Sequence, residues 1–254
     1  MARTHKKNWR VYISGYDMSG YGFNIGPLSS VYEEVGETAF TDGVHGKLNG
    51  VCTNSIGTLN TVFDNTASVG PHVVLSSVGN RIVTVAIGDV NAPAAGDPTF
   101  NGEFEQTGYL ANGEGMVTAT IPFAPSARAT SLLYDRPWGV LIHPSGAETG
   151  ANTDTSDHDF GAQTTYGGYG VFHMISSNGT ATLSIQDADT DENGSYSELI
   201  AADEADASSS PQSQIVALAT NATVERYIRW QLALNSATTV TFVISFIRII
   251  KEYY

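Results

Sequence analysis

The sequence predicts an all-β protein with little helix, and three observations support this class. Charged residues make up only 15% of the 254 residues while Gly reaches 26, a balance that favours short strands and turns over charge-rich surface helices. Thr, Val and Tyr, which suit strands, are abundant. Several segments alternate apolar and polar residues with the period of two that a strand imposes. A chain of this length can bury a full core, as one large β domain or two small ones.

Residues 226–250 show the clearest alternation. Every second position is apolar in two successive runs: Ile228, Trp230, Leu232 and Leu234, then Val240, Phe242, Ile244 and Phe246. The connection Asn235-Ser236-Ala237 has hairpin length, so residues 226–250 are predicted to form a β-hairpin. Residues 180–186 alternate in the same manner. The opposite face of such strands is predicted to present neutral hydroxyl and amide groups to water. In the second run that face carries Thr239, Thr241, Val243 and Ser245.

The two halves of the chain match weakly at an offset of 123 residues. The offset pairs Ile121 with Ile244, Phe123 with Phe246, Phe104 with Tyr227, Asn112 with Asn235 and Asp64 with Asp187. Strand periodicity alone produces such matches, so one module and two tandem tube-like modules both stay open. The two-module division gives a β module over 1–125, a junction over 126–136 and a second β module over 137–254. Residues 126–134 are the best candidate for a short helix.

The chain is strongly acidic, with a formal net charge of −14. Residues 137–225 contain no Lys or Arg but thirteen Asp or Glu, and residues 201–214 within them are predicted to be an exposed loop. An acidic surface repels duplex DNA and anionic membranes. The sequence therefore disfavours a basic nucleic-acid reader.

The single cysteine, Cys52, excludes a disulfide framework and a multi-thiolate metal site. Residues 1–10 are basic but lack the apolar core of a signal peptide. No apolar run reaches the length of a membrane span. We therefore expect a protein made inside the cell, without a membrane partner.

Residues 187–198 have a spacing that is typical of a metal loop. Asp187, Asp189, Asp191 and Glu198 stand at relative positions 1, 3, 5 and 12 of a calcium-binding loop. Glu192, however, occupies the sixth position, where such a loop needs Gly for its sharp turn. The sequence favours a solvated acidic hairpin, with calcium binding as the alternative.

Other residues that could carry chemistry are scattered. Asp157-His158-Asp159 lacks a second His at metal-ligand spacing, which favours an exposed acidic loop. No role is assigned to the remaining histidines, His5, His45, His72, His143 and His173. There is no nucleophile elbow and no phosphate-binding glycine loop. The sequence therefore predicts no catalytic, cofactor-binding or metal-binding residues, no cofactor and no enzymatic activity.

Residues 11–50 carry the most distinctive pattern, VYISGYDMSGYGFNIGPLSSVYEEVGETAFTDGVHGKLNG. A short β-like run meets a turn rich in Gly, Asp and Ser, then Ile25-Gly26-Pro27-Leu28, then an acidic segment. This order resembles the opening of the tail tube (major tail) proteins of long-tailed bacteriophages of the siphophage type. Residues 226–250 resemble the C-terminal strand pair of that family, and the two regions cover about a quarter of the chain. An ordinary strand–turn–strand opening of a β domain is the alternative.

The resemblance implies a tail-tube-type β-sandwich or barrel whose copies form rings, stacked into the hollow tube that delivers phage DNA. The long loop 33–50 would pack on neighbouring copies. One module per chain implies a hexameric ring, and two imply a trimer of pseudo-six-fold shape. The implied partners are further copies of the chain and the tape measure, tail terminator and distal tail proteins, with DNA passing through the lumen without specific binding. The implied location is the virion tail, after assembly in the host cytoplasm.

Two other classes stay open. A carbohydrate-binding β-sandwich, as a fibre or decoration module, would combine a calcium-holding acidic loop with exposed aromatic side chains, for which the candidates are Trp138, Tyr166, Tyr169 and Trp230. A small β-type glycoside hydrolase would need two carboxylates about 5–9 Å apart. Its candidate pairs are Glu33 with Glu34 and Glu103 with Glu105.

Overall fold

The computed structural model describes residues 6–37, 46–113, 115–126, 136–150, 152–153, 157–205 and 210–250. The protein is nearly all β and its sheets are antiparallel, which confirms the predicted class. In these residues helix is limited to a 3-10 turn, η1 (Lys6–Asn8), and α1 (Pro71–Leu75). α1 begins at a proline, whose missing N–H would have no helical partner there anyway. Residues 127–135, which hold most of the predicted junction and helix candidate, lie outside the described residues.

The strands fall into an earlier and a later group. The earlier strands are β1 (Trp9–Ile13), β2 (Tyr16–Asp17), β3 (Gly22–Glu37), β4 (Gly46–Val62), β5 (Gly79–Ile87), β6 (Pro98–Gln106), β7 (Leu110–Asn112) and β8 (Thr118–Pro125). The later strands are β9 (Trp138–Glu148), β10 (Asn152–Thr153), β11 (His158–Asp159), β12 (Gly168–Ser177), β13 (Ala181–Ala188), β14 (Ser197–Ala201), β15 (Gln212–Ala217), β16 (Tyr227–Leu234) and β17 (Val240–Arg248).

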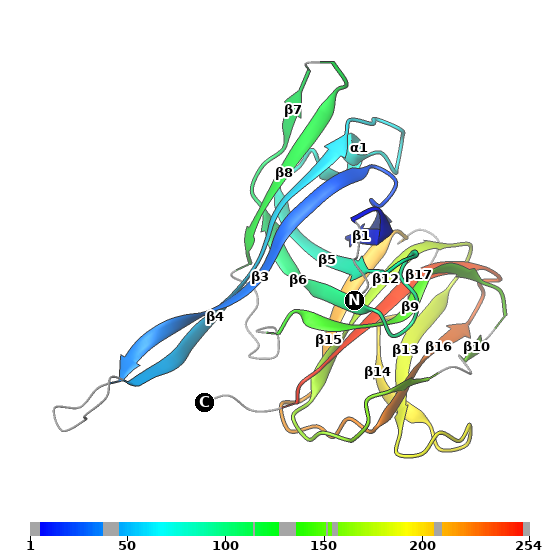
Figure 1. The fold of residues 1–254 in the computed structure, drawn as a ribbon. Coiled ribbons are helices and arrows are strands. Elements are labelled where there is room, and N and C mark those ends of the chain that lie inside the picture. Colours follow the sequence, from blue (N-terminus) through cyan, green and yellow to red (C-terminus); the bar gives the residue numbers. More distant parts are fainter. Residues whose placement is uncertain are drawn as a thin grey trace.

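The described strands form one sheet of twelve and one of five (Figure 1). The large sheet follows the path β15-β12-β17-β9-β6-β5-β1-β2, and β8 joins it at β6 and carries β4, β3 and β7. The small sheet has the order β10-β16-β13-β14, with β11 also on β16. β6 pairs with β9 from Pro98↔Val140 to Phe100↔Trp138. The earlier and later strands therefore share one continuous sheet.

The two largest hydrophobic cores among the described residues lie along this sheet. The N-terminal core joins β1, β5 and β6 to α1, β3, β4 and β8, and its most buried members include Ile13, Ile56, Leu59, Leu75 and Phe100. The C-terminal core packs β9, β12 and β17 of the large sheet against the small sheet, with Phe172, Ile185, Ile228, Phe242 and Phe246 among its members. The cores draw on residues 11–123 and 142–246 respectively. The division into two modules stays a prediction.

The predicted hairpin over residues 226–250 is wrong in its pairing, although both strands exist. β16 pairs with β13 in the small sheet, whereas β17 pairs with β9 and β12 in the large sheet. Their apolar faces meet across the C-terminal core, where the rings of Trp230 and Phe242 lie 5.4 Å apart, centre to centre. The connection therefore crosses from one sheet to the other. A hairpin would have placed both apolar faces in the same sheet and left them to be covered by another element.

The predicted solvent-facing side of β17 is also wrong. Val243 and Ser245 on that side are fully buried. The large sheet curls until its two ends meet at Gly15, between β1 and β2, where an added Cβ would lie 2.4 Å from the backbone nitrogen of Gln212 on β15. The curl covers this side of β17 with the strands of the N-terminal core, so that Val243 packs with Tyr12 and Ala86.

The strands related by the 123-residue offset pair differently. β13 and β16 pair with each other. At this offset β13 corresponds to the end of β4, and β16 corresponds to the segment around β6 and β7. The end of β4 does not pair with that segment but with β8. β8 in turn corresponds to β17, which lies in the opposite sheet from β13. The sequence match across the offset is therefore not accompanied by a matching strand order.

Candidate assembly interface

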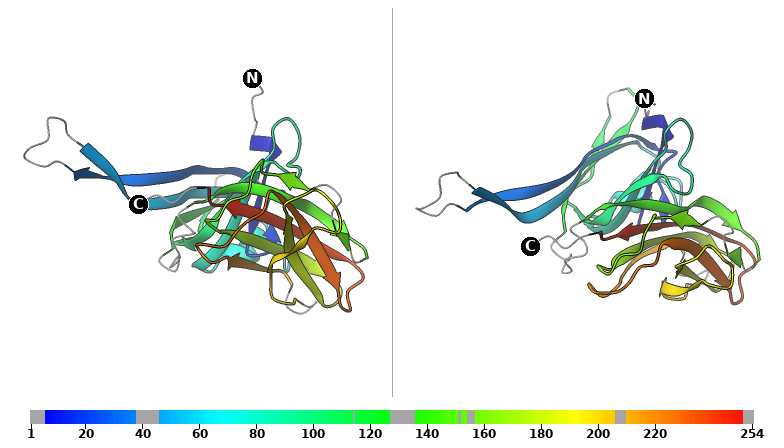
Figure 2. Two further views of the ribbon diagram at one scale, coloured as in Figure 1. Left: turned by 90° about the horizontal axis from the view of Figure 1, so that it is seen from below. Right: turned by 60° about the horizontal axis from the view of Figure 1, so that its bottom comes forward.

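The ribbon of β3 and β4 projects far from the body of the molecule (Figures 1 and 2). The two strands pair from Gly22↔Thr61 to Glu37↔Gly46. β8 pairs with β4 only at residues 58–62. Within the described residues, β4 therefore pairs beyond this point with β3 alone, and we call residues 28–37 and 46–56 the arm.

The predicted long loop 33–50 is largely strand. Residues 33–37 and 46–50 continue the β3–β4 ladder, and residues 38–45 lie outside the described residues. A shift in register between Tyr32 and Glu34 marks a bulge, after which the pairing resumes at Glu34↔Asn49 and Val35↔Leu48. A bulge accommodates an extra residue in one strand, so the backbone pairing of β3 and β4 continues beyond it.

The arm leaves the body at a close contact between the backbones of β3 and β4. Gly26 has φ +119°, a backbone conformation that favours glycine. Opposite it, a Cβ added to Gly57 would lie 2.5 Å from Cδ of Pro27 and 2.6 Å from the carbonyl oxygen of Gly26. Only a residue without a side chain fits at position 57, and this contact fixes the base of the arm.

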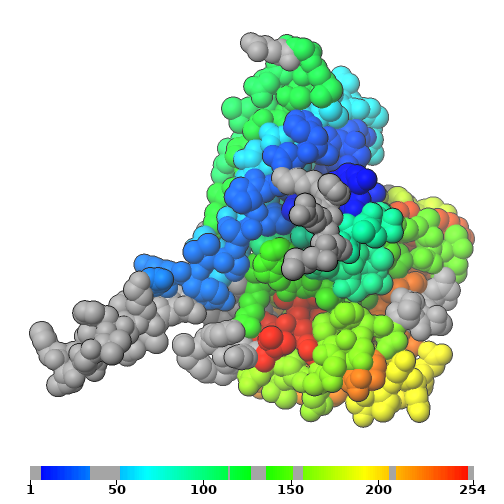
Figure 3. Space-filling view, in the orientation of Figure 1, coloured from blue at the N-terminus to red at the C-terminus, as the bar shows by residue number. Residues whose placement is uncertain are grey.

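The arm has small polar contacts between its strands and little apolar cover. The hydroxyl oxygens of Ser29 and Ser55 lie 2.7 Å apart, and Ser30 Oγ lies 3.2 Å from Cys52 Sγ. Val31 is 60% exposed, and Glu33 is exposed beside it. The space-filling view shows the β3 side of the arm standing clear of the body (Figure 3). This surface is available to another molecule.

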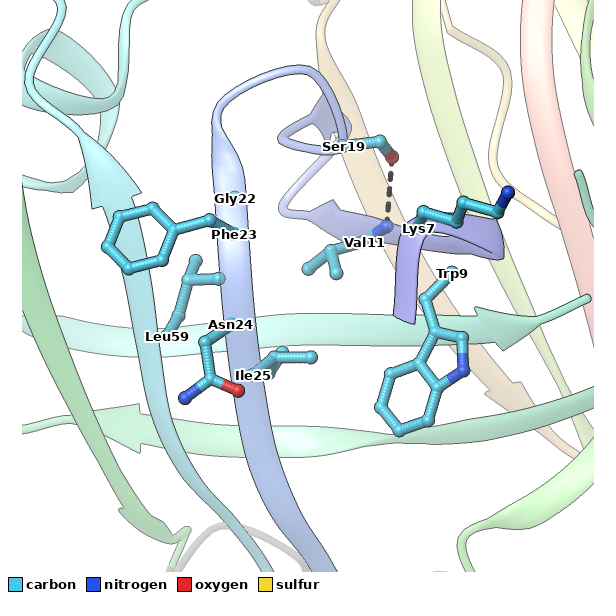
Figure 4. A pocket seen from close by; sticks show the side chains of 9 residues that line it. All are labelled: Lys7, Trp9, Val11, Ser19, Gly22, Phe23, Asn24, Ile25 and Leu59. Atoms are coloured by element: carbon cyan, nitrogen blue, oxygen red, sulfur yellow. Dashed lines mark hydrogen bonds between the residues drawn. The ribbon is translucent and has the colours of Figure 1, made fainter. Parts of the chain in front are cut away.

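An apolar groove runs along the base of β3. It consists of two adjoining pockets of ≈ 310 and ≈ 470 Å³ that share Trp9, Asn24 and Ile25. The first reaches Phe23 and Leu59, with Lys7 among the residues that line it (Figure 4). The second continues past Leu28 to Ile87 and Trp138. Phe23 and Trp138 are 55% and 48% exposed, so the groove presents a substantial apolar surface to solvent.

The acidic segment 187–198 is organised by an arginine. Arg229 on β16 is buried, donates to Gln186 Oε1 (2.8 Å) and Asn193 Oδ1 (2.8 Å), and lies over the ring of Tyr196. Asp187, the first carboxylate of the calcium pattern, instead accepts a hydrogen bond from the backbone N–H of Glu225 (2.9 Å). No group of three potential metal ligands gathers among the described residues. The arrangement fits the acidic hairpin predicted from the sequence.

Asp157-His158-Asp159 belongs to a packed edge of the small sheet. Asp159 accepts two hydrogen bonds from Arg226, at 2.7 and 2.6 Å, and the Arg226 guanidinium lowers the pKa of Asp159 to about 2. Burial lowers the pKa of His158. Its ring meets that of Phe160 edge to face. These contacts link β11 to β16 and do not form a reactive cluster.

The residues proposed for the carbohydrate and hydrolase alternatives are not gathered into one site. Tyr169 is fully buried and Trp230 is 6% exposed, so neither can stack on a sugar. Trp138 is exposed in the groove, while Tyr166 is partly buried against the cluster that contains Tyr169. None of the four carboxylates considered for hydrolysis, Glu33, Glu34, Glu103 and Glu105, lines either pocket of the groove.

His173, to which the sequence assigned no role, lies in a buried polar network between the two cores. Its Nε2 is 2.9 Å from Thr84 Oγ1, and its Nδ1 accepts a hydrogen bond from the backbone N–H of Gly15 (3.2 Å). Burial lowers the pKa of His173 to about 3, so the ring is neutral at pH 7. A single His among apolar residues gave no sign of this position in the sequence.

Asn101 on β6 is the centre of the network. Its Oδ1 accepts hydrogen bonds from Thr84 Oγ1 (2.9 Å) and Ser245 Oγ (2.7 Å). Its Nδ2 donates to Thr99 Oγ1 (2.7 Å) and to the carbonyl oxygen of Pro137 (3.3 Å). Buried amides and hydroxyls are tolerated when they are hydrogen-bonded in this way. The network joins β5, β6, β12 and β17 in one arrangement.

Comparisons with known proteins leave the chain without a family. No family model matches it, and no curated protein matches it. Among solved structures, the Dit (gp 19.1) protein of SPP1, described as a paradigm of the hub adsorption apparatus in phages that infect Gram-positive hosts, is similar over 94% of this chain and 98% of that chain, with 10% identity and a TM-score of 0.31. The insecticidal delta-endotoxin Cry8Ea1 from Bacillus thuringiensis is similar over 95% of this chain and 43% of that chain, with 10% identity and a TM-score of 0.24. Scores this low carry no argument, so the functional inference rests on the chain's own geometry.

Within the described residues, no helix has the length and apolar character needed to cross a membrane.

Proposed function

We propose that this protein is a structural protein of a phage tail, whose copies assemble into rings that stack into the hollow tail tube. The observation that carries the proposal is the arm, which projects from the body as a two-stranded ribbon. An isolated two-stranded ribbon is at best marginally stable in water. The described part of the chain leaves this ribbon uncovered, and contact with another copy covers it. The resemblance of residues 11–50 and 226–250 to tail tube proteins supports the same assignment.

The position of the arm favours a head-to-tail contact. The arm extends away from the body, so the surface that it offers and the surface that receives it lie on different parts of the chain. Such heterologous contacts close into rings or continue as filaments. The ring contains three or six copies, and rings stack into a tube within the virion tail after assembly in the host cytoplasm. The tape measure, tail terminator and distal tail proteins are the further partners.

The charge of the chain suits a conduit for DNA. With a net charge of −14, an assembled tube repels the phosphate backbone, so DNA slides through the lumen without specific binding. This role requires no catalytic residue and no cofactor.

Shortening the arm tests the proposal. Ser29 and Ser55 are directly opposite partners, so residues 30–54 can be replaced by Asn-Gly, which forms a tight two-residue turn. The wild type is expected to form rings or tubes in negative-stain images, and the shortened variant to stay monomeric while keeping a cooperative thermal unfolding transition. Top views of the wild-type rings then distinguish three copies from six.

Two results would contradict the proposal. One is a wild type that stays a compact monomer at high concentration, measured by light scattering. The other is a shortened variant that assembles as well as the wild type. A matched control, Glu192→Lys in the exposed acidic hairpin, changes the surface charge away from the arm and is expected to assemble normally.

A further inference from the structure

The groove along β3 has the properties of a docking surface. Trp9, Phe23, Ile25, Leu28 and Trp138 give it an apolar lining over two adjoining pockets. Contiguous exposed apolar surface of this kind marks sites of interaction in soluble proteins. The exposed cation Lys7 is part of the same lining.

We propose that this groove receives the arm of the next copy, with Val31 as the apolar anchor and Glu33 placed against Lys7. The inference rests on the proposed function and adds the receiving surface to it. Val31 is the most exposed apolar side chain among the described arm residues, and Glu33, two positions later on β3, is exposed as well. The arm therefore offers one apolar and one acidic group within three residues of β3.

The charges of the chain indicate which surface receives the arm. The chain has 26 Asp and Glu but only 12 Lys and Arg, so most pairs of surfaces from two copies repel each other. An acidic arm needs one of the few cations at its docking site. Several arginines are engaged within the chain: Arg226 binds Asp159, Arg229 binds Gln186 and Asn193, and Arg81 binds Gln106. Lys7 is exposed, and it lies beside an apolar surface.

The occupant is a second copy because the arm cannot enter its own groove. Glu33 lies five residues beyond Leu28 on the same extended strand, a span of about 17 Å. That strand leads away from the body (Figures 1 and 2). A contact between Glu33 and Lys7 therefore joins two different chains, and its repetition gives the head-to-tail arrangement.

A charge exchange tests the contact. Lys7→Glu and Glu33→Lys are each expected to raise the protein concentration needed for assembly at least about tenfold, because each places like charges together. The double variant restores opposite charges and is expected to return to within about threefold of the wild type. Glu192→Lys serves as the control for net charge. Light scattering against protein concentration measures all four variants.

A disulfide gives an independent readout. In a Cys52→Ser background, Val31→Cys and Phe23→Cys are expected to give a ladder of covalent multimers on oxidation when both are present in one chain. Neither substitution alone gives the ladder. Absence of the ladder from assembled tubes would overturn the inference.

The outcomes separate this inference from the proposed function. If the wild type assembles and Glu33→Lys blocks assembly but Lys7→Glu and Trp138→Ser do not, the arm has another receiving surface and only the inference fails. If the wild type never assembles, the proposed function fails first. If an oligosaccharide quenches Trp138 fluorescence while Trp138→Ser leaves assembly unchanged, the groove is a sugar site and the inference is overturned.

Discussion

His173 Nε2 and Thr84 Oγ1 lie 2.9 Å apart and join β12 to β5 across the boundary between the two cores. Because Nδ1 of His173 accepts from Gly15, the proton of the neutral ring is on Nε2, and Nε2 donates to Thr84. Thr84 then donates to Asn101, which fixes the direction of this chain of hydrogen bonds. A satisfied buried network of this kind specifies one arrangement of the elements that it joins.

The buried His173 makes stability depend on pH. Its pKa is lowered to about 3 in the folded protein, whereas an exposed His titrates near 6.5. Between these values the unfolded chain binds a proton that the folded chain does not, so stability falls as the pH falls, by about 1.4 kcal/mol per pH unit. The stabilisation that His173 gives by staying neutral in the folded protein is fully present only above the pKa of His in the unfolded chain.

Urea unfolding at pH 7, 5.5 and 4.5 checks the effect of His173. Comparing the wild type with His173→Gln, which keeps a donor and an acceptor, separates this group from the other titrating groups. The wild type is expected to lose more stability than the variant between pH 7 and pH 4.5. Equal losses would show that His173 is not the group responsible.

Substitution at the centre of the network is expected to be costly. Asn101→Leu leaves the hydroxyls of Thr84, Thr99 and Ser245 without their central partner, and we expect a loss of about 3 kcal/mol or more in the free energy of unfolding. Asn112→Ala, at an exposed asparagine, is the control and is expected to change it by less than about 0.5 kcal/mol. Similar denaturation midpoints for the two variants would contradict the central role of Asn101.

The close approach at the base of the arm gives a further prediction. Gly57→Ala would place a methyl group against Pro27 and the carbonyl of Gly26, and the strands must separate to admit it. We expect a destabilisation of about 1–3 kcal/mol and a higher concentration for assembly. Gly20→Ala, where an added Cβ meets nothing within 4 Å, is the matched control. Thermal unfolding and light scattering of both variants measure the difference.

Arg229, rather than calcium, is expected to hold the acidic hairpin. Arg229→Ala removes a buried guanidinium with two hydrogen bonds, and we expect a loss of about 2–4 kcal/mol. Arg226→Ala removes an exposed ion pair, and the expected loss is much smaller than that for Arg229→Ala. Millimolar calcium is expected to leave the melting temperature of the wild type unchanged. A rise with calcium that Asp189→Ala abolishes would restore the calcium-loop interpretation.

The strands were the most predictable part of the fold. The alternation in residues 226–250 identified the buried faces of β16 and β17, since Ile228, Trp230 and Phe242 are all in the C-terminal core. The same alternation could not say which sheet each strand joins, because a period of two is the same for a hairpin and for strands in opposite sheets. Val243 and Ser245 were assigned to solvent for a related reason: nothing local in the sequence shows that the large sheet curls back over them.

The candidate site was only partly predictable. The glycines and Pro27 marked the start of the arm, but residues 33–37 and 46–50 were expected to be loop because the resemblance to tail tube proteins implied a long loop over 33–50. These residues lack a regular apolar pattern, and a two-stranded ribbon that projects from the body needs none. The groove, with Trp9 from β1 and Trp138 from β9, joins residues far apart in the sequence and depends on the tertiary fold.

The pairing of β6 with β9 has a mechanical consequence. Only three residue pairs, Pro98↔Val140, Thr99↔Gly139 and Phe100↔Trp138, form this ladder, whereas β12 and β17 share nine. Tension that pulls the first half of the polypeptide from the second therefore loads this three-rung ladder together with the buried hydrogen bonds from Ser245 to Asn101 and between His173 and Thr84. The short ladder holds only as long as that buried network stays closed, so the polar groups between the cores also carry mechanical load.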